Sequence, residues 1–413
     1  MADGIFGQGM TALQHTIHSN LSDDFQETLA RALAGHDLLP EHAYRLIDAT
    51  GNDLSALMLT ASLVRDRYKG RTATYSRKVF IPLTNLCRQK CGYCTFSKAP
   101  GDPQAHTMTP DEVLAVAEAG SRHGCKEAMF SLGEKPEEIY PQVREQLAHL
   151  GHRTMVSYLR AMCELVLEQT SLLPHANPGV LTRRELAELR EVNASMGLML
   201  ENVSTRLMAP GGPHWQCAGK VPEARLGTIA CAGEMKVPFT TGLLIGIGET
   251  PQERVDSLLA IKELHARYGH IQEVIIQNLR VKEDTAMRRW REPSLQDMAR
   301  TIAVARLLLP AMNIQAPPNL APQAYQSYLL AGINDWGGVS PVTSDFINPE
   351  APWPSIAELK AVTEEAGFEL RERLAIYPEY LTRQDGFVPQ SLRQRALAWT
   401  DRDGYVRREK ERW

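Results

Sequence analysis

The stretch Val79-Phe80-Ile81-Pro82-Leu83-Thr84-Asn85-Leu86-Cys87-Arg88-Gln89-Lys90-Cys91-Gly92-Tyr93-Cys94 indicates the fold class of this chain. Its apolar start, residues 79–83, is typical of a buried strand. Three cysteines follow that strand in the spacing C-x3-C-x2-C. Strand and helix patterns then alternate almost to the end of the chain, which predicts an α/β fold, a parallel (β/α)8 barrel of the TIM type.

Seven further strands are expected from short apolar runs bounded by turn residues. They lie at 128–132, 172–175, 197–200, 239–245, 273–278, 313–316 and 336–340. Capping residues open helices between them at Thr109-Pro110, Thr182-Arg183-Arg184-Glu185 and Thr250-Pro251. An additional helix is expected at 155–168.

The chain divides into three expected parts. Apolar residues recur at helical spacing in 25–33, 42–47 and 56–64, which predicts a helical N-terminal extension over residues 1–70. Residues 69–77 are interpreted as a polar connector. We expect the barrel to occupy residues 71–370 and a C-terminal extension to occupy 371–413.

Composition excludes several classes of protein. The 413 residues are 43% apolar and 23% charged, which is ordinary for a globular protein and long enough for one barrel with extensions. A net charge of −4 gives no reason to expect a nucleic-acid partner. No apolar run approaches the roughly 20 residues that a membrane helix needs. The first thirty residues lack a basic region followed by an apolar one, so we expect a cytoplasmic protein.

The cysteines carry the clearest chemical signal. Seven are present, an odd number that argues against a disulfide framework. Cys87, Cys91 and Cys94 share one short loop, and thiolates suit zinc or an iron–sulfur cluster. A structural zinc site normally needs four ligands, and no second cysteine pair exists. On a 4Fe-4S cluster, three thiolates leave one iron open to bind another molecule. A zinc site or a redox dithiol remains the alternative. The other four cysteines are expected to be small buried hydrophobic residues.

Other polar and glycine-rich groups follow the expected strands, and in such barrels the C-terminal ends of the strands build the active site. Gly133 and Glu134 follow the second strand, where glycine lets backbone approach a ligand and a carboxylate can accept a bond from an ammonium. The turn Gly242-Leu243-Leu244-Ile245-Gly246-Ile247-Gly248-Glu249 follows the fifth, although it also suits simple helix–strand packing. It lacks a P-loop lysine, so a triphosphate cradle is poorly supported.

Further candidates lie at the ends of the remaining strands, where structural hydrogen bonds are the alternative role. Glu201 and Asn202 end the fourth strand, and Gln277 and Asn278 end the sixth. His175 and Asn177 lie in Pro174-His175-Ala176-Asn177-Pro178-Gly179 at the third. The last two clusters, Gln315-Ala316-Pro317-Pro318-Asn319-Leu320 and Asp335-Trp336-Gly337-Gly338-Val339-Ser340-Pro341-Val342-Thr343, suit a pocket for a flat polar heterocycle or tight turns at the bottom of a barrel.

The cysteine loop, with Tyr93 before the third cysteine, resembles that of the radical S-adenosylmethionine (SAM) enzymes. In that superfamily the amino and carboxylate groups of SAM chelate the open iron, and one electron splits SAM into methionine and a 5′-deoxyadenosyl radical. The Gly133-Glu134 pair resembles the motif that holds the SAM amino group, with Leu132 in place of one glycine. The turn 242–249 resembles the superfamily pattern G-x-[IL]-x-G-x-x-E beside the adenine.

Longer runs resemble one branch, the CofG-type enzymes and the N-terminal half of the fused FbiC enzymes. These runs are 75–84, 124–128, 174–179, 314–320, 335–343 and 348–354. The resemblance implies a lyase that converts 5-amino-5-(4-hydroxybenzyl)-6-(D-ribitylimino)-5,6-dihydrouracil to 7,8-didemethyl-8-hydroxy-5-deazariboflavin (FO), expelling ammonium, in coenzyme F(420) biosynthesis. The fused enzymes carry two cysteine loops and this chain carries one, so we expect cyclisation and not the preceding coupling.

The resemblance also implies roles for residues and partners. Cys87, Cys91 and Cys94 would bind the cluster. SAM would contact residues near it, which are Tyr93, Gly133, Glu134, Glu201, Asn202, Gly242, Gly246 and Glu249. Acid–base candidates are His175, Asp335 and Glu249, and substrate-binding candidates are Asn177, Gln277, Gln315 and Asn319. Partners would be a CofH-type radical SAM enzyme and a low-potential electron donor such as flavodoxin or ferredoxin.

Two alternatives remain at this point. One is another radical SAM reaction of the biotin-synthase-like group. The other is a non-enzymatic barrel stabilised by zinc, which would bind one zinc ion and leave SAM intact.

Overall fold

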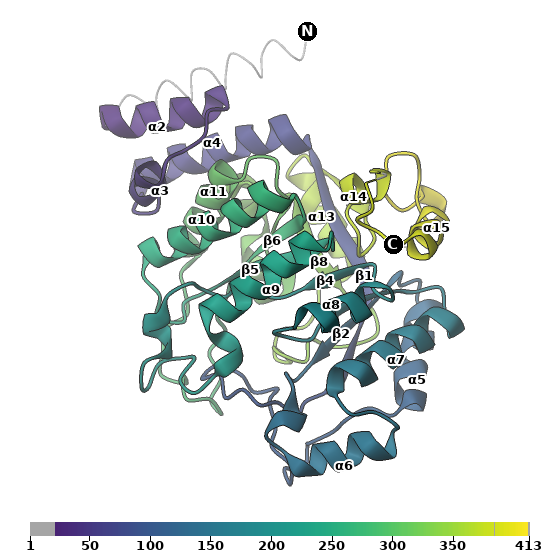
Figure 1. Cartoon of the computed structure of the whole chain (residues 1–413). Helices are drawn as coiled ribbons and strands as arrows, with labels where there is room; N and C mark the ends of the chain where they lie inside the picture. Colours follow the sequence, from purple (N-terminus) through teal and green to yellow (C-terminus); the bar gives the residue numbers. More distant parts are fainter. Residues whose placement is uncertain (1–20, 384, 412–413) are drawn as a thin grey trace.

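Eight parallel strands close into a barrel in a computed structural model that describes residues 21–383 and 385–411 (Figure 1). Each strand pairs with the next along the chain, and β8 pairs with β1 to complete the circle. The barrel strands are β1 (Thr72–Thr84), β2 (Glu127–Leu132), β3 (Leu173–Asn177), β4 (Ser195–Gly197), β5 (Phe239–Ile245), β6 (Ile271–Asn278), β7 (Ile314–Gln315) and β8 (Asp335–Val339). The predicted fold class is therefore confirmed.

Helices surround the barrel between successive strands. They are α5 (Pro110–Arg122), α6 (Pro141–His149), α7 (Met155–Gln169), α8 (Arg183–Arg190), α9 (Pro222–Glu234), α10 (Pro251–Tyr268), α11 (Leu295–Leu308), α12 (Tyr325–Ala331) and α13 (Ile356–Glu365). The predicted caps are confirmed, because the hydroxyls of Thr109, Thr182 and Thr250 each accept a hydrogen bond from the backbone N–H three residues later. Within the described ranges, every helix falls short of the length or apolarity that crossing a membrane requires.

Three helices precede the barrel, as the sequence predicts: α2 (Asp23–Ala34), α3 (Pro40–Leu46) and α4 (Gly51–Lys69). Helix α4 packs against α11 and α12. Helices α2, α3 and α4 (purple in Figure 1) therefore cover one side of the barrel wall. The expected extension starts at residue 1, and its first twenty residues lie outside the described ranges.

The residues after α13 close the end of the barrel at which the strands begin. Strand β9 (Glu369–Glu372) pairs in parallel with the first residues of β1. The chain then crosses to helices α14 (Pro378–Thr382) and α15 (Gln390–Leu397), and its apolar side chains pack against Leu173 and Ala194 at the starts of β3 and β4. We call residues 373–377 the floor segment.

Two local expectations are wrong. Residues 69–77 are no polar connector, because Thr72 already belongs to β1, and the hydroxyls of Thr74 and Ser76 point to buried carboxylates. The fourth strand is shorter than expected and lies earlier, at Ser195–Gly197; beyond it, Glu201, with a left-handed φ of 64°, makes an isolated pairing with Leu243. The expected boundary at 370 falls inside β9, and the division into three parts stays a prediction.

Candidate active site

Two adjoining cavities occupy the barrel. The outer cavity, of about 280 Å³, is lined by residues that follow the strands, including the three loop cysteines, Glu134, Glu201 and Lys220. The inner cavity, of about 170 Å³, lies deeper and is lined by Lys78, Glu127, His175, Thr240, Glu273, Gln315 and the floor-segment residues Arg373 and Ala375. Both are lined by Asn177, Gln277, Ile347 and Asn348, so the two cavities adjoin at these side chains.

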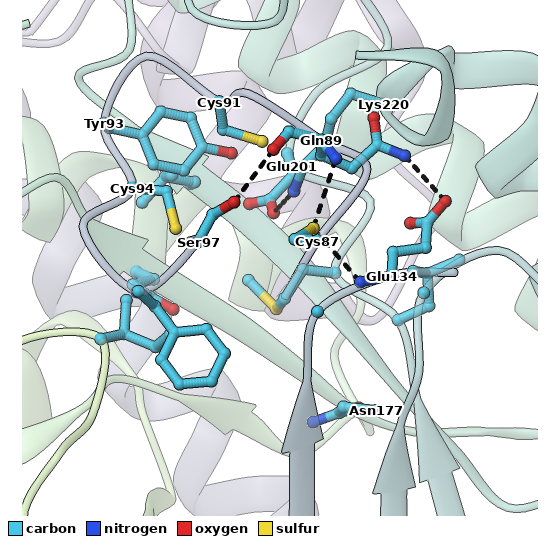
Figure 2. A pocket seen from close by; sticks show the side chains of 18 of the residues that line it. Cys87, Gln89, Cys91, Tyr93, Cys94, Ser97, Glu134, Asn177, Glu201 and Lys220 are labelled. Atoms are coloured by element: carbon cyan, nitrogen blue, oxygen red, sulfur yellow. Dashed lines mark hydrogen bonds and ion pairs between the residues drawn. The ribbon is translucent and has the colours of Figure 1, made fainter. Parts of the chain in front are cut away.

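The three loop cysteines gather at the outer cavity (Figure 2). The sulfur of Cys87 accepts hydrogen bonds from the backbone N–H groups of Gln89, at 3.3 Å, and Glu134, at 3.2 Å. Gly133 makes this approach possible, because a Cβ there would overlap the carbonyl of Leu86. The glycine before Glu134 therefore fixes the second strand end against the cysteine loop.

The three thiols have different electrostatic surroundings. Burial raises the pKa of the Cys87 thiol to about 11 and also raises that of Cys94. A hydrogen bond from the Cys217 thiol and the positive charge of Lys220 lower the pKa of Cys91 to about 7, although burial opposes them. Cys217 is buried, as predicted, but it lies behind Cys91 and does not line either cavity.

This arrangement fits a cluster better than a single ion. Among residues 21–383 and 385–411, no three His, Cys, Asp or Glu side chains converge closely enough to hold one metal ion. Zinc draws its sulfur ligands to about 2.3 Å from one point. A four-iron cluster instead gives each thiolate its own iron, so three cysteines spread around a cavity suit it.

Glu134 presents one occupied and one free oxygen. Its Oε1 accepts hydrogen bonds from Arg88, at 2.5 Å, and from the amide of Gln89, at 2.9 Å. Nothing in the described part of the chain donates to Oε2. A Cβ on Gly179 or Gly219 would overlap this carboxylate, so the two glycines leave space around it. Glu134 can therefore accept a hydrogen bond from a ligand ammonium at the cavity wall.

A second carboxylate, Glu201, faces the outer cavity from beyond β4. Burial opposes its charge, but Lys220 at 2.5 Å and Arg225 at 3.6 Å outweigh burial and hold the pKa of Glu201 below its ordinary value. The Tyr93 ring lies 5.9 Å from the Lys220 ammonium, and its hydroxyl bonds His214 Nε2 at 3.1 Å. Burial lowers the pKa of His214 to about 3, so this imidazole stays neutral.

The inner cavity contains charged groups that are almost completely buried. Lys78 on β1 lies 2.8 Å from Glu127 on β2, and the two residues are direct partners in the sheet. Burial opposes the charge of Glu127, but Lys78 and neighbouring cationic groups outweigh it and lower the Glu127 pKa to about 2. At the floor, Arg373 binds both Asp335, at 2.7 Å, and Glu273, at 3.0 Å.

His175 lines the inner cavity with a defined tautomer. Its Nδ1 lies 2.7 Å from the Ser195 hydroxyl, which donates its only proton to the carbonyl of Ala375. Because that proton is used, the contact favours the tautomer in which Nδ1 carries the hydrogen and Nε2 keeps its lone pair, and the Asn177 side chain is a further hydrogen-bond partner of this imidazole. Burial and the charge of Lys78 lower the pKa of His175 to about 4, so the neutral form is present at neutral pH.

The predicted site residues separate into three groups. Those on the outer cavity are the three loop cysteines, Tyr93, Gly133, Glu134 and Glu201. Those on the inner cavity are His175, Gln315 and Asn319, with Asn177 and Gln277 shared between the two. Those that line neither cavity are Asn202, Gly242, Gly246, Glu249 and Asp335.

The third group has structural roles in this geometry. The Glu249 carboxylate accepts the backbone N–H groups of Gly246 and Ile247 and binds Arg254 at 2.7 Å. Asn202 closes a turn by accepting the N–H of Ser204, and Asp335 is fully buried against Arg373. The structure therefore does not bring Asn202, Glu249 or Asp335 to the cavities.

Several cavity residues were not predicted from sequence. Lys78 and Glu127 lie in the runs 75–84 and 124–128, which carry the family resemblance but received no role. Arg373 lies in a stretch without a motif, and Lys220 and Arg225 follow a loop rich in glycine and proline. One signal was available, because a charged residue within an otherwise apolar strand pattern, such as Lys78 beside Val79, needs a buried partner.

Comparison with known proteins identifies the class. A family model described as the radical SAM superfamily matches residues 81–261. The hydrogenase maturase HydG of Carboxydothermus hydrogenoformans has a similar fold, with a TM-score of 0.72 at 17% identity, covering 96% of this chain and 93% of that one. Methylornithine synthase PylB gives a TM-score of 0.65 at 19% identity, covering 83% and 97%. The barrel, the three-cysteine loop and the matching family model define an enzyme of the radical SAM class, and this class implies a 4Fe-4S cluster and SAM.

Closer relatives identify the family. The 7,8-didemethyl-8-hydroxy-5-deazariboflavin synthase of Methanopyrus kandleri is 51% identical over 334 residues, which cover 81% of this chain and 99% of that enzyme. The FO synthase of Streptomyces coelicolor is 46% identical over 398 residues, which cover 94% of this chain and 46% of that one. The chain thus spans about half the length of that FO synthase, and it belongs to the 7,8-didemethyl-8-hydroxy-5-deazariboflavin synthase family.

Proposed function

We propose that this chain closes the central ring of FO. Its substrate would be 5-amino-5-(4-hydroxybenzyl)-6-(D-ribitylimino)-5,6-dihydrouracil, and ammonium, 5′-deoxyadenosine and methionine would be released beside FO. The observation that carries this proposal is the match over 99% of the M. kandleri enzyme, in a chain whose three loop cysteines line one cavity. The chain carries a single C-x3-C-x2-C loop, which favours the cyclisation alone.

The outer cavity is the proposed cluster and SAM site. Cys87, Cys91 and Cys94 would bind the cluster, which on reduction supplies the electron that splits SAM. The free oxygen of Glu134 would accept the SAM amino group. Glu201, held ionised by Lys220, has the charge to accept ribose hydroxyls. Tyr93 and Gly133 would form part of the cavity wall. The SAM contacts that the sequence predicts for four other residues are not supported, because these residues do not line the cavity: Asn202, Gly242, Gly246 and Glu249.

The inner cavity is the proposed substrate site. Asn177, Gln277, Gln315 and Asn319 all line it and offer amide groups suited to the uracil edge and the ribityl hydroxyls. Phe80 and Trp353 stack on each other there, with ring centres 5.1 Å apart, and form an apolar surface suited to the hydroxybenzyl ring. Because the two cavities adjoin, SAM and the substrate would lie next to each other inside the barrel, shielded from solvent.

His175 is the favoured base among the three acid–base candidates. Its unprotonated Nε2 belongs to a side chain that lines the inner cavity, and its neutral form accepts a proton at neutral pH. Asp335 is bound by Arg373, and Glu249 is bound by Arg254 and two backbone groups, so neither carboxylate is free to act. We therefore assign His175 to remove a proton from the substrate.

Two partners complete the proposal. A CofH-type enzyme would supply the coupled substrate, because this chain has one cysteine loop for one radical reaction. A low-potential donor such as flavodoxin or ferredoxin would reduce the cluster.

The test is an anaerobic assay of the reconstituted enzyme with SAM, a reductant and the coupled substrate. Fluorescence and chromatography would detect FO, and 5′-deoxyadenosine would be quantified beside it. We expect the two products in equimolar amounts. An enzyme that cleaves SAM but forms no FO would contradict the proposed reaction and point to another radical SAM reaction.

A further inference from the structure

Lys78 is a buried cation whose ammonium faces the inner cavity. Its side chain is 11% exposed, and that exposure is to the cavity, which it lines beside Glu127. Gly338 on β8 allows this course, because a Cβ there would overlap the Lys78 side chain. Burying a lysine ammonium in a barrel interior is unfavourable unless charged or hydrogen-bonding partners compensate for the lost water.

The Lys78 ammonium has N–H groups available to a ligand. A lysine has three N–H donors, and the hydrogen bonds within the described part of the chain use one of them, to Glu127 Oε1. The other oxygen of Glu127 accepts the hydroxyl of Ser76, so this carboxylate is held in place from both sides. Two Lys78 donors therefore remain for a molecule in the cavity.

Two further charged groups of the cavity, Arg373 and Glu273, are paired with each other, and the Asp345 carboxylate accepts hydrogen bonds from Asn319 and Asn348. Arg373 binds Asp335 and Glu273, and Glu273 also accepts the hydroxyl of Tyr377 at 2.8 Å. His175 is neutral and offers an acceptor. The inner cavity thus presents a proton donor on β1 and a proton acceptor on β3, on opposite sides of β2 and around one space.

We propose that Lys78 is the acid that protonates the amine leaving the substrate, and that Glu127 is the positioning residue that holds its ammonium in place. This inference rests on the proposed function, and it names a catalytic residue of that same site. Expulsion of ammonia breaks one C–N bond, whose electron pair stays on nitrogen, and an amine is a poor leaving group unless it is protonated.

The protons balance within the cavity. Lys78 gives one proton to the departing nitrogen, which leaves as ammonia, and His175 takes one proton from the substrate as the double bond forms. The elimination is therefore redox-neutral, and transfer of one proton from His175 to Lys78 restores both groups. Ammonia then takes a proton from water outside the cavity.

The test separates radical formation from ammonia loss. We would compare holoenzymes of the wild type, K78M and K78R by counting 5′-deoxyadenosine and FO from the same reaction. Arginine keeps the positive charge but holds its proton too tightly to act as an acid. We expect both variants to continue forming 5′-deoxyadenosine while FO formation falls by about 100-fold or more. Rescue of FO formation in K78A by added ethylammonium would be a second positive result.

Lys126 provides a matched control. It forms a buried ion pair with Glu372 at 2.8 Å, next to Glu127 in the sequence, but it lines neither cavity. K126M should lower stability yet keep the two products equimolar, and cluster content measured on every variant identifies any that fails to fold.

Two results would overturn the assignment of Lys78. One is a K78R enzyme that forms FO at the wild-type ratio, because the charge alone would then suffice for binding. The other is a K78M enzyme whose FO and 5′-deoxyadenosine stay equimolar. A wild-type enzyme that makes no FO would instead overturn the proposed function itself, so the two failures are distinguishable.

Discussion

The substitution R373M tests whether the floor segment holds the barrel closed. Arg373 is 2% exposed and binds Asp335, which is fully buried, and Glu273, which is 4% exposed. Methionine retains much of the volume but leaves both carboxylates without their cation. Removing one partner of a buried ion pair typically costs about 3–5 kcal/mol.

The expected change in melting temperature follows from chain length. An unfolding entropy of about 2.1 cal/mol/K per residue gives about 0.9 kcal/mol/K for a chain of this size. A loss of 3–5 kcal/mol therefore lowers the melting temperature by about 4–6 °C. Anaerobic thermal denaturation of the wild type and R373M would measure this difference.

A pH series and a surface control make the test specific. The unpaired carboxylates of R373M acquire a raised pKa, so the folded variant binds protons more readily than the unfolded chain. The difference in melting temperature between R373M and the wild type should therefore become smaller as the pH falls. R184M removes an ion pair to Glu188 at 2.9 Å on the surface and should change the melting temperature by less than about 1 °C. Equal melting temperatures for R373M and R184M would refute the role given to the floor segment.

Three further predictions concern the cavities. C91A should lose the cluster and its brown colour, whereas C217A should keep about four irons per chain by metal analysis; iron loss in C217A would mean that a fourth cysteine is needed. E134Q should raise the KM for SAM by about tenfold, because a charge-assisted bond becomes a neutral one; an unchanged KM would remove Glu134 from the SAM site. His175 has a folded pKa of about 4 against about 6.5 unfolded, so the unfolded state takes up the proton first as the pH falls. When the pH is lowered from 7.5 to 5.0, the unfolding free energy of the wild type should therefore decrease by about 2 kcal/mol more than that of H175N. Urea denaturation at both pH values measures this difference. Equal losses would mean that burial and the charge of Lys78 do not hold this imidazole neutral.

Local sequence signals predicted the parts of the fold that local interactions determine. The expected strand 239–245 matches β5, because a mainly apolar run bounded by the turn residues Pro238 and Gly246 favours a buried strand. The three threonine caps are confirmed because each cap is made within four residues. The three loop cysteines lie together on one cavity because their spacing is short.

The parts of the fold that the sequence did not predict are held in place by ion pairs between residues far apart in the chain. Strand β9 reads Glu-Leu-Arg-Glu and has no apolar run; besides its pairing with β1, its burial depends on the ion pair of Glu372 with Lys126, which lies 246 positions earlier. The floor segment depends in the same way on Arg373 and Asp335. Asp335 was expected at the active face, but it is the first residue of β8 and so lies at the opposite end of the barrel.

The central claim is that one iron of the 4Fe-4S cluster has no protein ligand and is open to SAM. Mössbauer spectroscopy of the anaerobically reconstituted, iron-57-labelled enzyme, before and after SAM is added, measures this directly. We predict a four-iron cluster in which one iron changes its isomer shift when SAM binds, while the three held by cysteine do not. A spectrum that SAM leaves unchanged, or a sample without the four-iron cluster, would contradict the account.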